Sequence, residues 1–434
     1  MARASLQGAV QVSSQGPYLF LQGPSSPLFS NMAGHLTRAG HACYRINLNV
    51  GDQIFWRRGG AMNYRGRAED WSSFVQQFVQ DYGIKTVILF GEERPYHREA
   101  IKVAKAYGAT IVAVEMGYLR PDWVTVERDG LSSNSHFPND PAAILKAAEN
   151  LPEPHWTRRF NQTFLAEALF DLAYYLPASF LWFLYPHYRF HGISHPLREY
   201  AGWIGRLITK RRRSREAANL QRRLMASPGS YFVYPLQLET DYQLRSHSPF
   251  NSQREAIELV LQSFAARADK DARLAVKTHP LDNGLISWRK VVQATADRFS
   301  IGDRVVFLDG GDLGALFSGA RGVVTVNSTA ALAALTLGIR AKVLGSAVYD
   351  IPGLTAQEAI DDFWQSEGQP DEALKKAFFR LVAYSIQERG NFCSYDGADA
   401  AARAIARRLL EGRLNADSGG GLRRKPVKLE KPKV

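Results

Sequence analysis

Lys277, Thr278 and His279 are the first residues whose types and spacing suit chemistry. They follow the run 273–276, which predicts a short buried strand, and Pro280 ends that strand and fixes the turn. Open α/β sheets bind ligands at the carboxyl ends of their strands. A lysine and a histidine at such an end suit an anionic ligand such as a phosphate, although a His-Pro pair there also occurs as ordinary turn chemistry.

Asn327, Ser328 and Thr329 form a second group, between the predicted strand 322–326 and the predicted helix 330–337. A helix N-terminus presents N–H donors and a partial positive charge, and the two hydroxyls add to them. Together with the lysine and histidine above, they would hold the phosphate of a departing nucleotide. The alternative for the two hydroxyls is simple N-capping of the helix.

Carboxylates supply the other half of the expected chemistry. Glu239 and Asp241 follow Gln237 and are two residues apart. On an extended segment they would point the same way, whereas in an irregular loop only one of them would face the cleft. Glu115 follows another predicted strand and lies near Arg120. Stepwise retaining glycosyl transfer usually needs one carboxylate that attacks the anomeric carbon and another, here Glu115 from across a cleft, that acts as acid and base. The spacing does not assign these roles, and a structural ion pair between Glu115 and Arg120 is an equal alternative.

Gln22, Gly23 and Pro24 end a predicted strand at 18–21 and precede a predicted helix at 29–39. Backbone N–H groups and two serines in this loop could approach a ligand. The alternative is a tight turn that caps the helix.

Strands and helices alternate in both halves of the chain at the spacing of doubly wound domains. We therefore expect an α/β fold with two Rossmann-like domains in a GT-B-type arrangement. The expected segments are an acceptor-side domain at 1–150, a helical aromatic and basic insert at 151–226, a nucleotide-binding domain at 227–390, a C-terminal helix at 391–416 and a disordered basic tail at 417–434.

The insert begins with an apolar and aromatic stretch at 164–185, which is nearly long enough to span a bilayer. Glu167, Asp171 and Pro177 argue against spanning. Because basic residues follow, the insert suits an interfacial hairpin on an anionic membrane; the alternative is a buried helical pair with a solvated basic helix. The expected membrane contacts are Trp182, Trp203, Lys210, Arg211, Arg212 and Arg213.

The composition narrows the class of protein. A chain of 434 residues is too long for one core, and its net charge of +12 implies a polyanionic partner. Nucleic acid is not expected, because the basic residues gather in the insert and the tail and not along an aromatic groove. Two cysteines give no disulfide framework, and the first residues show no apolar segment of signal-peptide length, so we expect a reducing cytoplasm.

Five short motifs occur together in this chain. They are Gln22-Gly23-Pro24 with Phe29-Ser30-Asn31, Glu115 to Trp123, Pro235 to Asp241, His279-Pro280, and Asn327 to Ala330. Over about residues 15–400 they resemble the capsular polysaccharide biosynthesis and export proteins of Gram-negative bacteria, most of all the single-module β-Kdo transferases that start the lipid-linked Kdo linker. Met116 departs from the pattern, since we expect a more polar residue there in relatives.

The resemblance implies a cytoplasmic enzyme that is peripheral on the inner membrane. It would move Kdo from CMP-Kdo to lysophosphatidylglycerol with retention, as the first β-Kdo of the capsule glycolipid, without a metal or other cofactor. Its implied partners are these two substrates, the anionic inner-membrane surface and other capsule biosynthesis and export proteins. The alternatives are a transferase for another CMP-sugar or acceptor, and a non-catalytic export or assembly factor.

The resemblance also implies roles for individual residues. Asp241 matches the covalent nucleophile, Glu115 the glutamate of the first domain, and His279 the histidine at the CMP phosphate. The remaining residues expected to bind substrate are Gln22, Gly23, Pro24, Arg120, Gln237, Glu239, Lys277, Asn327, Ser328 and Thr329.

Overall fold

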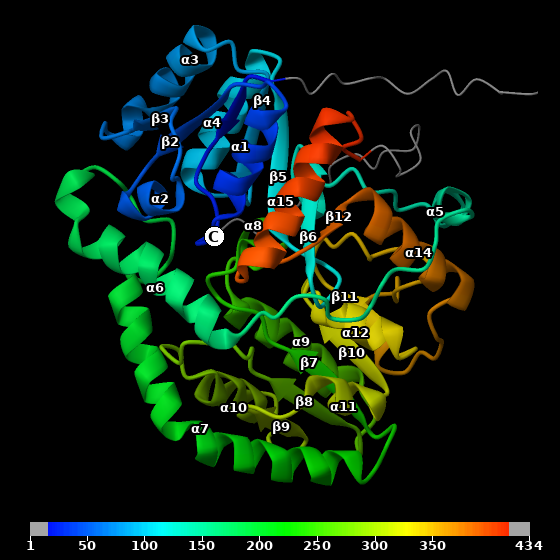
Figure 1. Cartoon of the computed structure of the whole chain (residues 1–434). Helices are drawn as coiled ribbons and strands as arrows, with labels where there is room; N and C mark the ends of the chain where they lie inside the picture. Colours follow the sequence, from blue (N-terminus) through cyan, green and yellow to red (C-terminus); the bar gives the residue numbers. More distant parts are fainter. Residues whose placement is uncertain (1–15, 416–434) are drawn as a thin grey trace, which may run out of the picture. The chain divides into compact units, whose positions relative to one another are not determined.

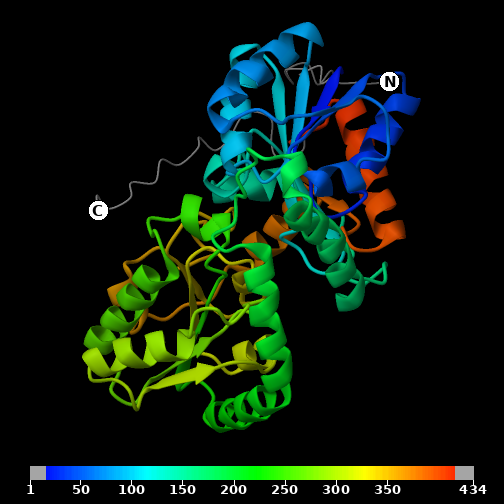
Figure 2. The same ribbon diagram turned by 90° about the vertical axis from the view of Figure 1, so that its left-hand side faces the viewer.

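The computed structural model describes residues 16–415, which divide into two compact units (Figures 1 and 2). Of the described residues, unit 1 contains 16–138, Lys146–His191 and 379–415. Unit 2 contains Asn139–Leu145 and Gly192–Phe378. Each unit has its own sheet, so the expected α/β class with two Rossmann-like domains is confirmed.

The sheet of unit 1 has seven strands in the order β12-β6-β5-β4-β1-β2-β3. The first five strands of the chain run parallel, β6 is antiparallel to β5, and β12 is antiparallel to β6. The strands are β1 (Tyr18–Phe20), β2 (Cys43–Asn47), β3 (Ala61–Asn63), β4 (Thr86–Phe90), β5 (Thr110–Met116), β6 (Trp123–Arg128) and β12 (Gln387–Arg389).

Helices cover both faces of this sheet, which is why its central strands are apolar throughout. Tyr18 and Phe20 of β1 pack in one core with α1 and α15, and Leu19 packs in the opposite core with α3 and α4. The helices of unit 1 are α1 (Leu28–Arg38), α2 (Val50–Phe55), α3 (Trp71–Asp81), α4 (Pro95–Ala106), α6 (Phe164–Phe180) and α15 (Tyr395–Leu410), with the 3₁₀ turns η1 (Ala68–Asp70), η2 (Ser132–Asn134) and η3 (Trp182–Leu184).

The sheet of unit 2 has five parallel strands in the order β11-β10-β7-β8-β9. Helices α9, α10 and α13 pack on one face, and α11, α12 and the end of α7 pack on the other. The strands are β7 (Tyr231–Pro235), β8 (Arg273–Lys277), β9 (Val305–Leu308), β10 (Gly322–Thr325) and β11 (Ala341–Val343). The helices are α7 (Pro196–Met225), α8 (Tyr242–Ser246), α9 (Gln253–Arg267), α10 (Trp288–Arg298), α11 (Leu313–Ser318), α12 (Ala330–Thr336) and α13 (Ile360–Phe363). Two further helices, α5 (Pro141–Ala148) and α14 (Glu372–Ser385), contain residues of both units.

The unit boundaries differ from the expected segments. The segment 227–390 extends too far, because β12 completes the sheet of unit 1. The insert 151–226 is divided, since α6 belongs to unit 1 and α7 to unit 2. The helix expected within 391–416 is α15, which packs on α1 in unit 1. The expected tail at 417–434 lies outside the described residues.

Helix α6 occupies the first half of the segment in which the hairpin was expected. It begins after Thr163, whose hydroxyl accepts the Ala166 amide, and it contains Pro177. In the described part of the chain, no helix is both long enough and apolar enough to cross a bilayer.

Candidate active site

The strand order of unit 2 brings the predicted phosphate-binding residues to one edge of its sheet. β7 lies between β8 and β10, and the three strands run parallel, so the residues that follow them share the carboxyl edge. His279 follows β8 and Ser328 follows β10, with one strand between them. Since neighbouring strands lie about 4.8 Å apart, the axes of these two strands are about 10 Å apart.

Lys277 is the last residue of β8 and lies between Pro235 of β7 and Leu308 of β9. Its side chain is only 4% exposed. Among the residues that the structure describes, none accepts a hydrogen bond from its ammonium group. Burial lowers its pKa, whereas the carboxylates of Asp309 and Asp312 oppose this shift. A buried cation without a protein hydrogen-bond partner at a strand end is suited to an anionic ligand.

His279 is half-buried in the turn after β8. Its Nδ1 accepts a hydrogen bond from the Leu281 amide at 3.1 Å, and its carbonyl accepts the Asp282 amide. Because Nδ1 is the acceptor, the neutral imidazole carries its proton on Nε2 and is a donor there. The turn chemistry and the ligand-binding interpretation of the His-Pro pair are therefore compatible.

Gln237 and Asn327 have a different role from the one expected. Asn327 Oδ1 accepts from Gln237 Nε2 at 2.8 Å, and the Asn327 amide donates to Gln237 Oε1 at 3.0 Å. Asn327 Nδ2 also donates to the carbonyls of Gln243 and His247. Since both side chains are buried and engaged in these bonds, they hold together the loops after β7 and β10.

Ser328 and Thr329 precede α12. The Ser328 hydroxyl accepts a hydrogen bond from the Ala330 amide at 3.2 Å. This bond agrees with the alternative interpretation, in which the hydroxyl caps the N-terminus of the helix. The Thr329 side chain makes no capping bond to α12. Of the two hydroxyls, that of Thr329 therefore remains the better candidate for a ligand contact.

Glu239 and Asp241 lie in a turn, which is the irregular-loop alternative and not the extended segment. Glu239 Oε2 accepts the Gln253 amide at 2.9 Å, at the start of α9. Asp241 Oδ1 accepts the Gln243 amide at 2.8 Å and caps α8. Burial raises the pKa of Asp241, and the Gln243 amide only partly offsets it. The two carboxylates thus hold different helices and do not act as a matched pair.

Gln22 lies at the carboxyl edge of the sheet in unit 1, where it is buried and fully engaged. Its Nε2 donates to the hydroxyls of Tyr174 and Tyr188, and its Oε1 accepts from Arg94. Gly23 and Pro24 shape the loop. A Cβ on Gly23 would come within 2.8 Å of the Phe29 ring, and the Pro24 carbonyl accepts the Ser26 amide. The three residues therefore shape the loop before α1, and their contact with substrate stays a prediction.

Glu115 is the second-last residue of β5 and lies just beyond the pairing of β5 with β4. Its Oε1 accepts the Met116 amide at 2.9 Å. Arg120 is exposed, and the carboxylates of Glu115 and Glu167 are close enough to act on its charge. Glu115 and Asp241 belong to different units, so their pairing as acid/base and nucleophile stays a prediction.

A buried polar network next to Gln22 was not expected from the sequence. Arg45 Nη2 pairs with Asp52 Oδ1 at 2.8 Å, and the Tyr174 hydroxyl donates to the same oxygen. Asn49 Nδ2 donates to the Tyr174 hydroxyl. A sequence signal existed only for the local part, since Asn49 and Asp52 have the spacing of an N-cap, and Asn49 does accept the Asp52 amide.

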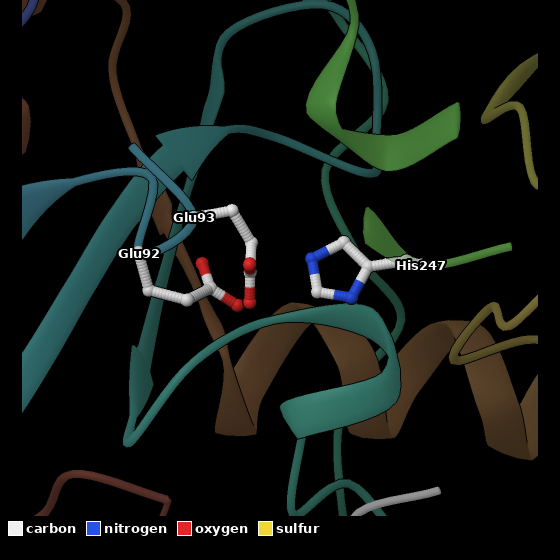
Figure 3. A group of neighbouring side chains, drawn as sticks. All are labelled: Glu92, Glu93 and His247. Carbon is white, nitrogen blue, oxygen red and sulfur yellow. The ribbon is translucent and has the colours of Figure 1, made fainter. Parts of the chain in front are cut away.

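Two neighbouring glutamates follow β4 and were also not singled out by the sequence. The carboxylate oxygens of Glu92 and Glu93 lie within 4.8 Å of each other, as Figure 3 shows. Glu92 accepts hydrogen bonds from the Leu131 amide and from Asn134, and Asn134 also donates to Glu93. His247, drawn in the same figure, belongs to unit 2. Within unit 1 the two glutamates fix the turn that contains η2.

The expected membrane contacts fall into two groups. In unit 1, five consecutive side chains at 180–184 are exposed, among them Trp182 at 63%. In unit 2, α7 packs on the core through Leu224 but exposes Ile204, Leu207 and Ile208. Lys210, Arg211 and Arg212 are exposed and Trp203 is half-buried.

Arg213 differs from its neighbours in α7. It pairs with Asp309 at 2.9 Å and donates to the Arg206 carbonyl. Since its guanidinium is engaged within unit 2, we remove it from the expected membrane contacts.

Comparison with known proteins gives a family match. The model of the family described as "Capsule polysaccharide biosynthesis protein" matches residues 85–393. The capsule polysaccharide export protein KpsS of Escherichia coli is 33% identical over 362 residues, covering 83% of this chain and 92% of that protein. The capsule polysaccharide modification protein LipB of Neisseria meningitidis serogroup A is 30% identical over 382 residues, covering 87% of this chain and 91% of that protein.

Among solved structures, the β-Kdo 2,7 transferase of Thermosulfurimonas dismutans KpsC aligns with a TM-score of 0.45 at 15% identity. The alignment covers 91% of this chain and 99% of that one.

Proposed function

Because the chain belongs to the capsule polysaccharide biosynthesis protein family, we propose that it is a retaining glycosyltransferase of the GT-B type. It moves Kdo from CMP-Kdo to lysophosphatidylglycerol and so forms the first β-Kdo of a capsule glycolipid. The observation that carries this proposal is the carboxyl edge of unit 2. There Lys277 ends β8 as a buried cation, and His279, two residues later, has Nε2 as the donor nitrogen of its neutral ring.

In this proposal the nucleotide phosphate is the leaving group. The Lys277 ammonium and the His279 Nε2–H stabilise the negative charge that develops on the phosphate as its bond to the anomeric carbon breaks. Thr329 adds a hydroxyl near the start of α12. No step requires a metal ion, since lysine and histidine supply the positive charge and the donor.

Asp241 is the proposed nucleophile. Its carboxylate oxygen forms a bond to the anomeric carbon of Kdo, while CMP departs with the electron pair of the broken bond. An acceptor hydroxyl then loses its proton to Glu115 and displaces Asp241 from the same carbon. Two inversions give net retention. Asp241 is only partly exposed, and partial desolvation makes a carboxylate more nucleophilic than full hydration does.

We further propose that the protein binds the cytoplasmic face of an anionic inner membrane. The apolar residues 180–184 of unit 1 would enter the lipid interface, and Lys210, Arg211 and Arg212 of α7 would face the phosphates. This placement matches a lipid acceptor that stays in the membrane.

The test is transfer by the purified protein. With CMP-Kdo and a lysophosphatidylglycerol analogue, we expect a mono-Kdo lipid by mass spectrometry. Asp241→Asn should lose transfer and keep its fold, since asparagine caps helices as well as aspartate does. If other CMP-sugars give product and CMP-Kdo does not, the donor assignment is wrong.

A non-catalytic role is the second candidate, because the Escherichia coli relative is named an export protein. In that case Asp241→Asn and His279→Ala should leave capsule production intact in cells. Loss of capsule in both variants, with normal protein levels, would exclude this role.

A further inference from the structure

The loop after β9, residues 309–312, carries two carboxylates next to Lys277. Lys277 pairs in register with Leu308, and Asp309 is the next residue in the chain. Side chains alternate along a strand, so Lys277 points to the same face as Ala275, which packs with Leu224 of α7. The charges of Asp309 and Asp312 both act on the Lys277 ammonium. The lysine, the loop and α7 therefore meet on one face of the sheet.

Two arginines of α7 bind the first carboxylate of this loop. Arg206 Nη2 lies 2.7 Å from Asp309 Oδ1, and Arg213 Nη1 lies 2.9 Å from the same oxygen. Arg206 Nη1 also donates to Asp309 Oδ2 at 3.4 Å. The side chains of Arg206 and Arg213 are 13% and 21% exposed, so solvent screens these pairs less than it screens surface pairs. Asp309 thus has a fixed position beside Lys277.

A glutamine of α7 binds the other end of the loop. Gln221 Nε2 donates to the Asp312 carbonyl at 2.8 Å, and Gln221 Oε1 accepts the Asp312 amide at 3.0 Å. Gly311 has a φ of 81°, and a Cβ there would lie 2.3 Å from Gln221 Oε1. A Cβ on Gly310 would lie 3.3 Å from Ala217 of α7. Glycines therefore allow the loop to pass directly under the helix.

We propose that the loop 309–312, held by α7, keeps the Lys277 ammonium charged and in position for an anionic phosphate, and that Arg206, Arg213 and Gln221 are positioning residues of that site. The proposal rests on the proposed function, since the phosphate ligand is taken from it. Its physical basis is that burial favours a neutral lysine, whereas two carboxylates at fixed positions favour the cation. If the loop moved away, Lys277 would lose charge and the site would lose affinity for anions.

The charge of Lys277 can be measured without any nucleotide. Brief acetylation with acetic anhydride at increasing pH, followed by peptide mass spectrometry, reports the fraction of neutral Lys277. In Asp309→Asn and in Gln221→Ala we expect Lys277 to react about tenfold faster than in the wild type at a given alkaline pH. Asp309→Glu should restore slow labelling, because it keeps the charge. Equal labelling in all variants would overturn the proposal.

Nucleotide affinity gives the second measurement. Calorimetric titration with CMP should show about tenfold weaker binding to Asp309→Asn and Arg213→Ala at alkaline pH, with a smaller difference at neutral pH. The matched control is Arg215→Ala, which removes an exposed arginine from the same helix and should bind CMP as the wild type does. If the wild type does not bind CMP, the proposed function fails, while the labelling result still decides the role of the loop. If the wild type binds CMP and the loop variants bind it equally well, the loop has no such role.

Discussion

The hydroxyl of Tyr174 donates a hydrogen bond to Asp52 Oδ1 across 3.0 Å, and both residues are buried in unit 1. Tyr174 belongs to α6, whereas Asp52 belongs to α2 and forms an ion pair with Arg45 of β2. One side of α6 is therefore anchored in the polar interior of unit 1. Its other side exposes Phe164, Leu165 and Leu169.

The Arg45–Asp52 pair predicts unequal costs of substitution. Asp52→Ala should lower the free energy of unfolding by about 3–5 kcal/mol, because it leaves the buried Arg45 charge without its partner. Tyr174→Phe should cost less, about 2 kcal/mol, because the three hydrogen bonds of its hydroxyl (from Gln22, from Asn49 and to Asp52) are lost while the Arg45–Asp52 ion pair is kept. Urea unfolding followed by circular dichroism measures both. The control is Asp81→Ala, an exposed site in α3, for which we expect a change within about 0.5 kcal/mol. Equal losses in the two buried variants would contradict this account of the network.

The raised pKa of Asp241 predicts how kcat/KM for transfer falls at acidic pH. Burial raises this pKa, and a nucleophilic carboxylate must be ionised, so kcat/KM should fall as pH drops through that raised pKa. The fall should begin at a higher pH than an exposed aspartate would give. Transfer rates measured over a series of buffers, with thermal melting at each pH, separate this effect from unfolding. A flat acidic limb down to the ordinary aspartate range would remove Asp241 from the nucleophile role.

The lowered pKa of His97 predicts how the free energy of unfolding depends on pH. His97 is fully buried, its Nδ1 lies 2.6 Å from the Gly91 carbonyl oxygen, and burial with the nearby charge of Arg94 lowers its pKa from 6.5 to about 3. Between these pH values the unfolded chain binds a proton that the folded chain does not, so stability is lost as pH falls below 6.5. The loss should be at most about 1.4 kcal/mol per pH unit. His97→Gln should flatten the curve of unfolding free energy against pH in this range. His35→Gln, a partly buried histidine of α1, serves as the comparison, and an unchanged slope in His97→Gln would contradict the prediction.

The exposed face of α7 predicts binding to anionic vesicles. Each basic residue near such a surface contributes about 1 kcal/mol, so replacing Arg211 and Arg212 by serine should weaken binding about thirtyfold. Sedimentation with phosphatidylglycerol vesicles measures the change, and neutral phosphatidylcholine vesicles should bind both forms weakly. The control replaces Arg403 and Arg407, two exposed arginines of α15, by serine. If this control loses as much binding as the α7 variant, net charge and not the helix explains the affinity.

The sequence predicted the parts of the fold that local pattern determines. The apolar runs of β4 and β7 are buried on both faces, which requires helices above and below, and the two-unit α/β class follows from their repetition. β12 could not be predicted, because Gln387–Arg389 is short and polar and is stabilised by pairing with β6, which is distant in the sequence. Because β12 was not predicted, the expected nucleotide-binding domain was extended to residue 390.

For the site, the sequence predicted which residues gather at a sheet edge but not which of them are engaged there. Lys277 and His279 follow β8 as expected. Gln237 and Asn327 are engaged with each other, and that bond depends on two strands lying side by side. The ion pair of Arg213 with Asp309 likewise joins residues 96 positions apart, so the local basic cluster gave no sign of it.

The packing of α1 against α15 in one core has a consequence for biosynthesis. The ribosome makes the first strands of unit 1 long before it makes α15, which covers one face of their sheet, and β12, which is the last strand of that sheet. Unit 2 is encoded almost entirely by one continuous stretch, Gly192–Phe378, and can fold as soon as that stretch emerges. Until α15 emerges, part of the apolar face that it covers in the finished unit 1 stays uncovered, whereas unit 2 needs no later segment of the described chain.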